Sequence, residues 1–159
     1  MADAAVNVSS EVSAEEVTID TSRFGRLIVD IDKIIAMTSP FLGFPESRRF
    51  VLRPHGQESP FMWLQSLDNP TLAFVVLHAA SFLPHYQPKI PGFILKELDS
   101  PEQGQLELFI ILTIPKGNPQ RMTANLLGPV AVNTARRLAK QVLLDPTQYD
   151  PCWPVFSQA

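Results

Sequence analysis

The chain has 159 residues, of which 45% are hydrophobic, so it is long enough for one domain with a sizeable core and too apolar for disorder throughout. Fifteen prolines against seven glycines disfavour a helical bundle, because proline breaks helix interiors. The net charge is -3, but five of the acids lie in the first 20 residues; the other 11 acidic residues are balanced by 13 basic ones, which gives no reason to expect direct nucleic-acid binding.

Cysteine usage and targeting patterns indicate the compartment. Cys152 is the only cysteine, so an intrachain disulfide is excluded and a cysteine-based zinc site is nearly so. The N-terminal residues lack the basic and apolar regions of a secretory signal, and the longest apolar run, near Leu108–Leu112, is too short to span a bilayer. We therefore expect a soluble, cytoplasmic protein.

The first half of the chain predicts a tail followed by short strands. Residues 1–15 are small, polar and acidic, which predicts a flexible acidic tail ahead of a single β domain at residues 16–159. Val17–Asp20 and Gly25–Asp30 are short runs rich in β-forming residues, and Phe50–Arg53 is another, ended by a Pro-His-Gly sequence.

The middle of the chain has the clearest patterns. Phe61–Ser66 and Ala73–His78 are apolar runs on either side of an Asp-Asn-Pro turn, which predicts a β-hairpin. Phe93–Leu98 has the apolar spacing of a short helix. In Gln105–Ile114, one face of the predicted strand is wholly aliphatic and the other is polar only at its ends, which predicts a strand that is buried on both faces at its centre.

The C-terminal third is less uniform. Leu126–Asn133 is β-like, with Gly128-Pro129 marking an edge or a bulge, and Val142–Leu144 predicts a last strand. By propensity alone, Asn133–Leu143 favours a helix over a strand, with Asn133 or Thr134 as its cap. Many short strands at regular spacing predict an all-β fold, either an antiparallel barrel or a sandwich, with at most one or two short helices.

No set of residues in the sequence has the pattern of a catalytic, cofactor or metal site. His78 and His85 are seven residues apart, a spacing that suits neither a zinc-protease helix nor a zinc finger. There is no nucleophile-elbow motif, no phosphate-binding glycine loop and no histidine near Cys152. The sequence therefore predicts a protein that is not an enzyme and that needs no cofactor or metal.

Two segments are candidates for partner binding. In the first, Phe61, Trp63 and Gln65 share one face of a predicted strand. Aromatic residues at such positions pack in a core more often than they form an exposed surface that binds a partner. The second, from Met122 to Leu127, is either a turn entering a strand or a contact loop. A small basic cluster, formed by Arg136, Arg137 and Lys140, is either solvated or contacts an acidic partner.

These two segments carry a family resemblance. PFMWLQSLDNPTLAFVV, at Pro60–Val76, resembles the pattern PFxWLQSxxxPxLAFxV of the FliW family of flagellar assembly factors. LTIPKGNPQRMTANLLGPVAVN, at Leu112–Asn133, resembles the second pattern of that family, a TIP strand end followed by MTANLxAPIxIN. Gly128 stands where alanine is common in the family, and the resemblance extends over residues 17–149.

The resemblance implies both a fold and a function. The fold is a small antiparallel β-barrel-like domain without cofactor, in which Thr134–Leu138 is a turn between strands rather than part of a helix. FliW proteins bind flagellin as a chaperone, and they bind and inhibit CsrA, a dimeric RNA-binding repressor of translation. The resemblance thus predicts flagellin and CsrA as partners, with flagellin synthesis coupled to assembly, and Phe61, Trp63, Gln65, Met122, Asn125 and Leu126 as candidate contact residues.

Two other functions remain open from the residues alone. A small-ligand or enzymatic β-barrel requires a deep polar pocket with convergent titratable groups. Direct RNA binding requires exposed aromatic side chains on which bases stack, a role that Phe61 and Trp63 would fill only if they are exposed.

Overall fold

The structure is a computed structural model, which describes residues 15–156. The acidic tail predicted at residues 1–15 lies outside the described residues except for Glu15. No helix among the described residues is both long and apolar enough to cross a membrane. The elements are β1 (Glu16–Thr21), β2 (Gly25–Asp30), β3 (Ile35–Met37), β4 (Arg49–Pro54), β5 (Phe61–Ser66), β6 (Ala73–His78), α2 (Ala79–Phe82), α3 (Gly92–Glu97), β7 (Glu107–Thr113), β8 (Thr123–Ala124), β9 (Val130–Asn133), β10 (Leu138–Gln141) and β11 (Trp153–Pro154), with 3-10 turns at Ile31–Lys33, Gln103–Gln105 and Pro119–Arg121.

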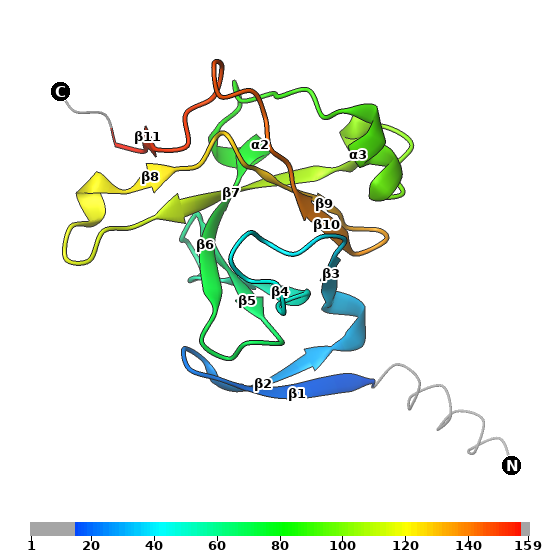
Figure 1. Cartoon of the computed structure of the whole chain (residues 1–159). Helices are drawn as coiled ribbons and strands as arrows, with labels where there is room; N and C mark the ends of the chain where they lie inside the picture. Colours follow the sequence, from blue (N-terminus) through cyan, green and yellow to red (C-terminus); the bar gives the residue numbers. More distant parts are fainter. Residues whose placement is uncertain (1–14, 157–159) are drawn as a thin grey trace, which may run out of the picture.

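Seven of the strands close into a barrel. The order is β7-β6-β5-β4-β3-β10-β9, and β9 pairs back with β7 to complete the ring (Figure 1). All neighbours are antiparallel except β3 and β10, which are parallel. β8 and β11 extend the sheet beyond β7. The all-β prediction with two short helices is confirmed, and so is the predicted hairpin of β5 and β6.

The barrel interior is filled by side chains. Alternate residues of each strand point inward, and they include Phe50, Leu64, Val76, Phe109 and Val132, each no more than 6% exposed. The space left between them measures about 10 Å³, which is about the smallest volume that holds one water molecule. The interior therefore has no room for a small ligand, which counts against the ligand-binding barrel.

Three smaller apolar clusters cover the outside of the barrel, because the outward faces of its strands are apolar too. One lies under α2 and β8, and its centre is Leu77 and Ile110. A second lies under α3, where Ile94 and Leu98 are buried as the predicted helical spacing requires. In the third, the β1–β2 hairpin packs on Val51. The layers outside the barrel thus position every surface described below.

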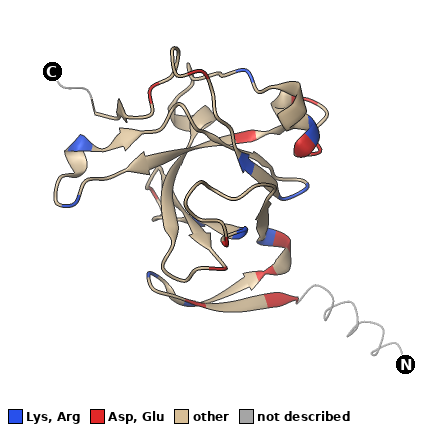
Figure 2. Cartoon of the chain, viewed as in Figure 1, with Lys and Arg blue, Asp and Glu red and all other residues tan. Residues whose placement is uncertain are grey.

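The β1–β2 hairpin has a strongly acidic end. Glu16 and Asp30 are direct cross-strand partners, and both are exposed. Asp32 follows in the next turn, beside Lys33, so acidic positions lie close together where the hairpin joins the barrel, with a basic position next to them (Figure 2). Like charges directly opposite each other in a sheet are destabilising, so this end of the hairpin favours a cation beside it.

The helix that propensity favours at Asn133–Leu143 is wrong. Asn133 ends β9, residues 134–137 form a turn, and β10 begins at Leu138, as the family resemblance implies. The strand pairs with β9 on one side and with β3 on the other, so tertiary pairing overrides helix propensity here. The last strand is therefore not Val142–Leu144, which lies beyond β10 and is irregular.

Candidate functional site

A groove with aromatic walls lies beside the C-terminal segment. We call it the aromatic groove; its volume is about 590 Å³, within the range of ligand-sized sites. The side chains of Phe82 and Trp153 are 48% and 37% exposed, which is unusual for residues of this size and apolarity. The residues that line the groove are Phe82, Leu83, Pro84, His85, Tyr86, Gln87, Leu126, Gln148, Tyr149, Asp150 and Trp153.

Three segments that are distant in sequence meet at the groove, next to α2, β8 and β11 (Figure 1). The Tyr86 hydroxyl donates to the carbonyl oxygen of Leu126 over 2.6 Å, and the backbone N–H of Leu126 donates to the carbonyl oxygen of Asp150 over 3.0 Å. The rings of Tyr86 and Tyr149 meet edge to face, 5.7 Å apart. Burial, with a smaller effect of neighbouring Tyr149, raises the pKa of Tyr86 well above its usual value, so its hydroxyl remains a donor.

Three of the six predicted contact residues come together under or beside this groove. Phe61, Met122 and Leu126 belong to the apolar cluster under α2 and β8. Met122 is only 4% exposed, so it supports the wall from below. Leu126 lines the groove itself. Their role in binding remains a prediction, and Leu126 is the one of the three whose position favours direct contact.

Trp63 and Gln65 lie elsewhere on the outer face of β5. Trp63 packs against the β1–β2 turn, with the Phe24 ring edge-on at 5.9 Å and the His55 ring stacked at 5.8 Å. Gln65 is fully buried, and its side-chain Nε2 donates to the carbonyl oxygens of Ser66 and Leu72. Its position favours a structural role, because it holds the turn between β5 and β6.

Asn125 shapes the backbone beside the groove. Its side-chain Oδ1 accepts hydrogen bonds from the backbone N–H groups of Leu127 and Gly128, which forms a tight turn. A Cβ added at Gly128 would lie 2.8 Å from Nε2 of Gln141 and 3.2 Å from Nδ2 of Asn125. The glycine at this position is therefore matched to its two amide neighbours.

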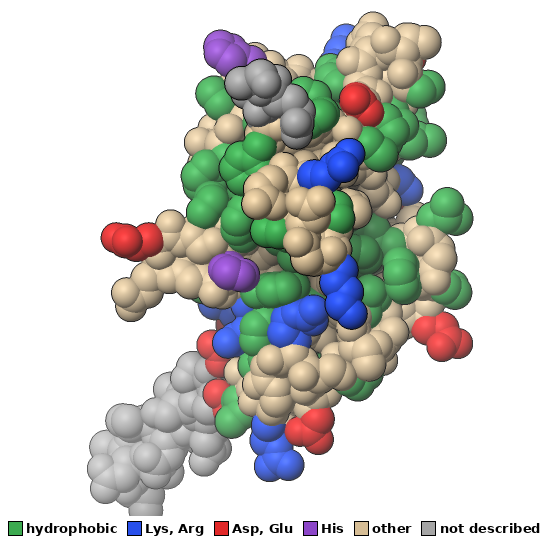
Figure 3. Space-filling view, turned by 90° about the vertical axis from the view of Figure 1, so that its left-hand side faces the viewer, with side chains coloured by type: hydrophobic (Ala, Val, Ile, Leu, Met, Phe, Trp, Pro, Cys, Tyr) green, Lys and Arg blue, Asp and Glu red, His purple; other side chains and the backbone are tan. Residues whose placement is uncertain are grey.

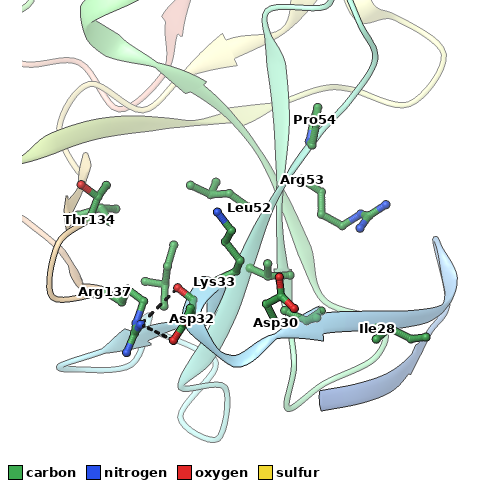
Figure 4. A pocket seen from close by; sticks show the side chains of 13 residues that line it. Ile28, Asp30, Asp32, Lys33, Leu52, Arg53, Pro54, Thr134 and Arg137 are labelled. Atoms are coloured by element: carbon green, nitrogen blue, oxygen red, sulfur yellow. Dashed lines mark hydrogen bonds and ion pairs between the residues drawn. The ribbon is translucent and has the colours of Figure 1, made fainter. Parts of the chain in front are cut away.

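A second groove, with polar walls, lies between the β1–β2 hairpin and the barrel and measures about 550 Å³ (Figure 4). Arg137 and Asp32 form an ion pair across it at 3.3 Å, and the side chain of Lys33 points toward Leu52. The groove is lined by no histidine, cysteine or serine, and residues 15–156 contain no group of three potential metal ligands. The residues that line this groove are suited to holding the β1–β2 hairpin against the barrel.

One chain of contacts has the composition of a catalytic triad. The His78 ring has Ser81 Oγ 2.7 Å from Nδ1 and Glu107 Oε2 2.6 Å from Nε2. His78 immediately precedes α2, so these contacts tie the first turn of that helix to β7. The His78 side chain makes no capping hydrogen bond, so these contacts are side-chain pairs that join the end of β6 to α2 and β7. The prediction that the chain is not an enzyme stays a prediction.

The sequence analysis missed most of the aromatic groove. Tyr86 and Tyr149 lie in irregular segments, while Phe82 ends the four-residue helix α2 and Trp153 begins the two-residue strand β11, so no periodicity marks an exposed face. The one signal in the sequence is the frequency of aromatic residues beside Pro84, Pro151 and Pro154.

Comparison with known proteins gives a consistent result. The family model described as "FliW protein" matches residues 18–155. The flagellar assembly factor FliW of Magnetococcus marinus is 38% identical over 138 residues, which cover 87% of this chain and 84% of the relative. That of Geobacter sulfurreducens is 38% identical over 141 residues, covering 89% and 87%. A crystal structure of the flagellar assembly factor FliW superposes with a TM-score of 0.81 at 31% identity, covering 89% of this chain and 99% of the other.

Proposed function

The chain belongs to the FliW family of flagellar assembly factors, and on this basis we propose that it binds flagellin as a chaperone and also binds and inhibits the translational regulator CsrA. It acts in the cytoplasm by binding rather than by catalysis. When free flagellin binds the protein, CsrA is released, and the released CsrA lowers flagellin synthesis. Flagellin synthesis is thereby coupled to flagellum assembly.

The aromatic groove is the observation that carries the flagellin half of the proposal. A subunit that awaits assembly still exposes apolar surface that becomes buried between subunits afterwards. Exposed Phe82 and Trp153, with Tyr86 between them in sequence, offer the aromatic anchors that dominate binding energy at protein interfaces. The groove therefore suits an apolar segment of flagellin.

The acidic end of the β1–β2 hairpin supports the CsrA half. CsrA-type proteins are basic where they hold RNA, and Glu16 and Asp30 offer charge of the opposite sign, whereas Asp32 is already paired with Arg137. Such charges raise association rates and orient a basic partner even where they add little to the final affinity. Each partner thus has a surface of matching chemistry.

The two surfaces lie at different ends of the barrel (Figure 1). The arrangement therefore does not favour overlapping binding sites. We propose that the two partners are coupled through two states of the protein with different affinities. A coupling free energy of about 1 to 3 kcal/mol, typical of allosteric proteins, changes affinity roughly 5- to 150-fold.

Isothermal titration calorimetry with flagellin and CsrA from the same genome tests the proposal. We expect a stable complex with each partner, and a weaker affinity for CsrA when flagellin is bound. A gel shift of the flagellin leader RNA by CsrA should be reversed by the protein, whereas the protein alone should not shift the RNA. Failure to bind either partner would rule the proposal out.

A further inference from the structure

Two arginines lie over aromatic rings on the outer side of β4 and β5, where the β1–β2 turn covers them. The guanidinium carbon of Arg23 is 4.3 Å from the centre of a Trp63 ring, and that of Arg53 is 5.0 Å from the centre of the Phe24 ring. Figure 3 shows basic side chains next to a histidine and hydrophobic side chains on this side of the molecule. We call Arg23, Phe24, Arg53, His55 and Trp63 the arginine–aromatic face.

The rings of this face hold the two guanidinium groups in place. Arg53 and Trp63 are direct cross-strand partners of β4 and β5, and Phe24 meets Trp63 edge to face. His55, the residue that follows the end of β4, stacks on Trp63. Cation–π contacts restrain each arginine without using its in-plane N–H groups, so those donors stay oriented for a ligand.

These donors have no acceptor among the described residues. Neither Arg23 nor Arg53 takes part in any of the ion pairs or side-chain hydrogen bonds at residues 15–156, and Nε of Arg53 is buried without a hydrogen-bond partner. Arg26, on the same hairpin, differs because it pairs with Asp20 at 3.3 Å. Nε of Arg53 cannot be reached from outside, but the Nη groups of Arg53 are not buried and form no hydrogen bond within residues 15–156, so an external acceptor is favoured there.

We propose that the arginine–aromatic face binds an acidic peptide segment of a partner protein, with carboxylates accepting the free N–H groups of Arg23 and Arg53. The planar guanidinium group matches a carboxylate in two parallel hydrogen bonds. The positive charges of Arg23 and Arg53 complement the carboxylates of such a segment, although the chain as a whole carries a net charge of -3.

Single-stranded RNA is the competing ligand, and the geometry disfavours it. Base stacking requires a free aromatic face, and the indole of Trp63 is already contacted by the guanidinium of Arg23 and the imidazole of His55. A base would have to displace both groups. The site also lies apart from the aromatic groove, so it does not depend on whether that groove binds flagellin.

Fluorescence anisotropy with labelled peptides tests this site. The probe is a short peptide of alternating glutamate and glycine, with the matching glutamine–glycine peptide and an oligouridylate as comparisons. We expect the glutamate peptide to bind, more weakly at high ionic strength, and the glutamine peptide not to bind. Arg23→Gln and Arg53→Gln should each weaken binding roughly tenfold, since each removes one charge-assisted contact.

Arg26→Gln is the matched control, because it removes the same charge from the same hairpin but from an arginine that is already paired. It should leave peptide binding unchanged. Arg23 is exposed in a turn, so its variant keeps the test decisive even if Arg53→Gln fails to fold. No binding by the native protein, an equal loss in Arg26→Gln, or tighter binding of oligouridylate than of the glutamate peptide would each overturn the proposal.

Discussion

The hydroxyl group of Tyr86 donates a hydrogen bond of 2.6 Å to the backbone carbonyl oxygen of Leu126. The bond joins the irregular segment after α2 to the chain that leaves β8, 40 residues further on. The backbone N–H of Leu126 also donates a hydrogen bond to the carbonyl oxygen of Asp150 in the C-terminal segment. One residue thus fixes both walls of the aromatic groove, and it is one that the family resemblance had already nominated.

Replacing Tyr86 with phenylalanine should destabilise the protein by about 1 kcal/mol, the net value of a typical hydrogen bond whose acceptor is partly buried. The ring and its contact with Tyr149 are retained, so the groove should keep its shape but lose rigidity. Urea unfolding followed by circular dichroism measures the difference. An unchanged midpoint would show that the bond contributes nothing to stability.

We also expect the effect of Tyr86→Phe on the free energy of unfolding to depend on pH in the alkaline range. The folded-state pKa of Tyr86 is raised, so the unfolded chain releases this proton near pH 10, about the usual tyrosine pKa, while the native protein retains it. The contribution of Tyr86 is therefore fully present below about pH 10 and is lost as the pH rises toward the folded pKa. The stability advantage of the native protein over Tyr86→Phe should shrink above about pH 10, and a constant difference would contradict this.

Asp68 provides the corresponding test at acidic pH. Burial alone would raise its pKa, but the backbone N–H groups of Arg48 and Arg49, each 2.8 Å away, and the Arg49 guanidinium hold the pKa below its usual value. The contribution is therefore present above about pH 4 and is lost as the pH falls through the folded pKa. Asp68→Asn should cost about 1 to 2 kcal/mol at neutral pH and much less in acid. An equal cost at both pH values would show that charge is not involved.

The β9–β10 turn holds an arginine in a conformation that suits glycine. Arg137 has a φ of 57°, in the left-handed region that costs a non-glycine residue roughly 1 to 2 kcal/mol. Arg137→Gly should therefore stabilise the protein by about 0.5 to 1 kcal/mol, after the greater flexibility of unfolded glycine and the exposed pair with Asp32 are allowed for. Arg136→Gly also removes an exposed ion pair but relieves no strain, so thermal unfolding should show it to be destabilising.

Gly128 lies against two amide side chains, and replacing it tests how closely they are matched to it. Gly128→Ala would place a methyl group against Nε2 of Gln141, whose hydrogen bond to the Gly128 carbonyl oxygen is 3.0 Å long. We expect a loss of about 1 kcal/mol from disturbing that bond. In a Gln141→Ala background the same substitution should cost clearly less, because the closer of the two contacts, that with Nε2 of Gln141, is gone. Equal costs in the two backgrounds would show that the residues are not coupled.

Local pattern predicted most of the strands. The β5–β6 hairpin follows from two apolar runs around an Asp-Asn-Pro turn, and β7 from a wholly aliphatic face opposite one that is polar only at its ends. The strand β10 could not be predicted from local pattern, because Arg136-Arg137-Leu138-Ala139-Lys140 has a high helix propensity. Only its pairing with β3 and β9 makes this segment a strand. Closure of the barrel between β7 and β9 is equally a long-range feature.

The candidate site was harder to predict because its residues depend on distant contacts. Placing Phe61, Trp63 and Gln65 on one face of β5 was correct, but other elements cover that face, so the core-packing interpretation holds for Gln65. Phe82 and Trp153 become neighbours of one groove only because β11 pairs with β8. A single sequence contains no local signal for that pairing.

Displacement of CsrA by flagellin tests the central claim, that the aromatic groove is where flagellin binds and causes CsrA to be released. Flagellin is titrated into the preformed complex with CsrA, and free CsrA is measured by its binding to leader RNA. The groove variant is Phe82→Ser with Trp153→Ser, and the control is Phe93→Ser, which removes a 71% exposed phenylalanine from α3, outside the groove.

We predict that the native protein and Phe93→Ser release CsrA at the same flagellin concentration. The groove variant should still hold CsrA but require roughly tenfold or more flagellin, since exposed aromatic anchors contribute at least about 1 to 2 kcal/mol each. Release from the groove variant at the native flagellin concentration, or flagellin binding to the native complex without release of CsrA, would contradict the account.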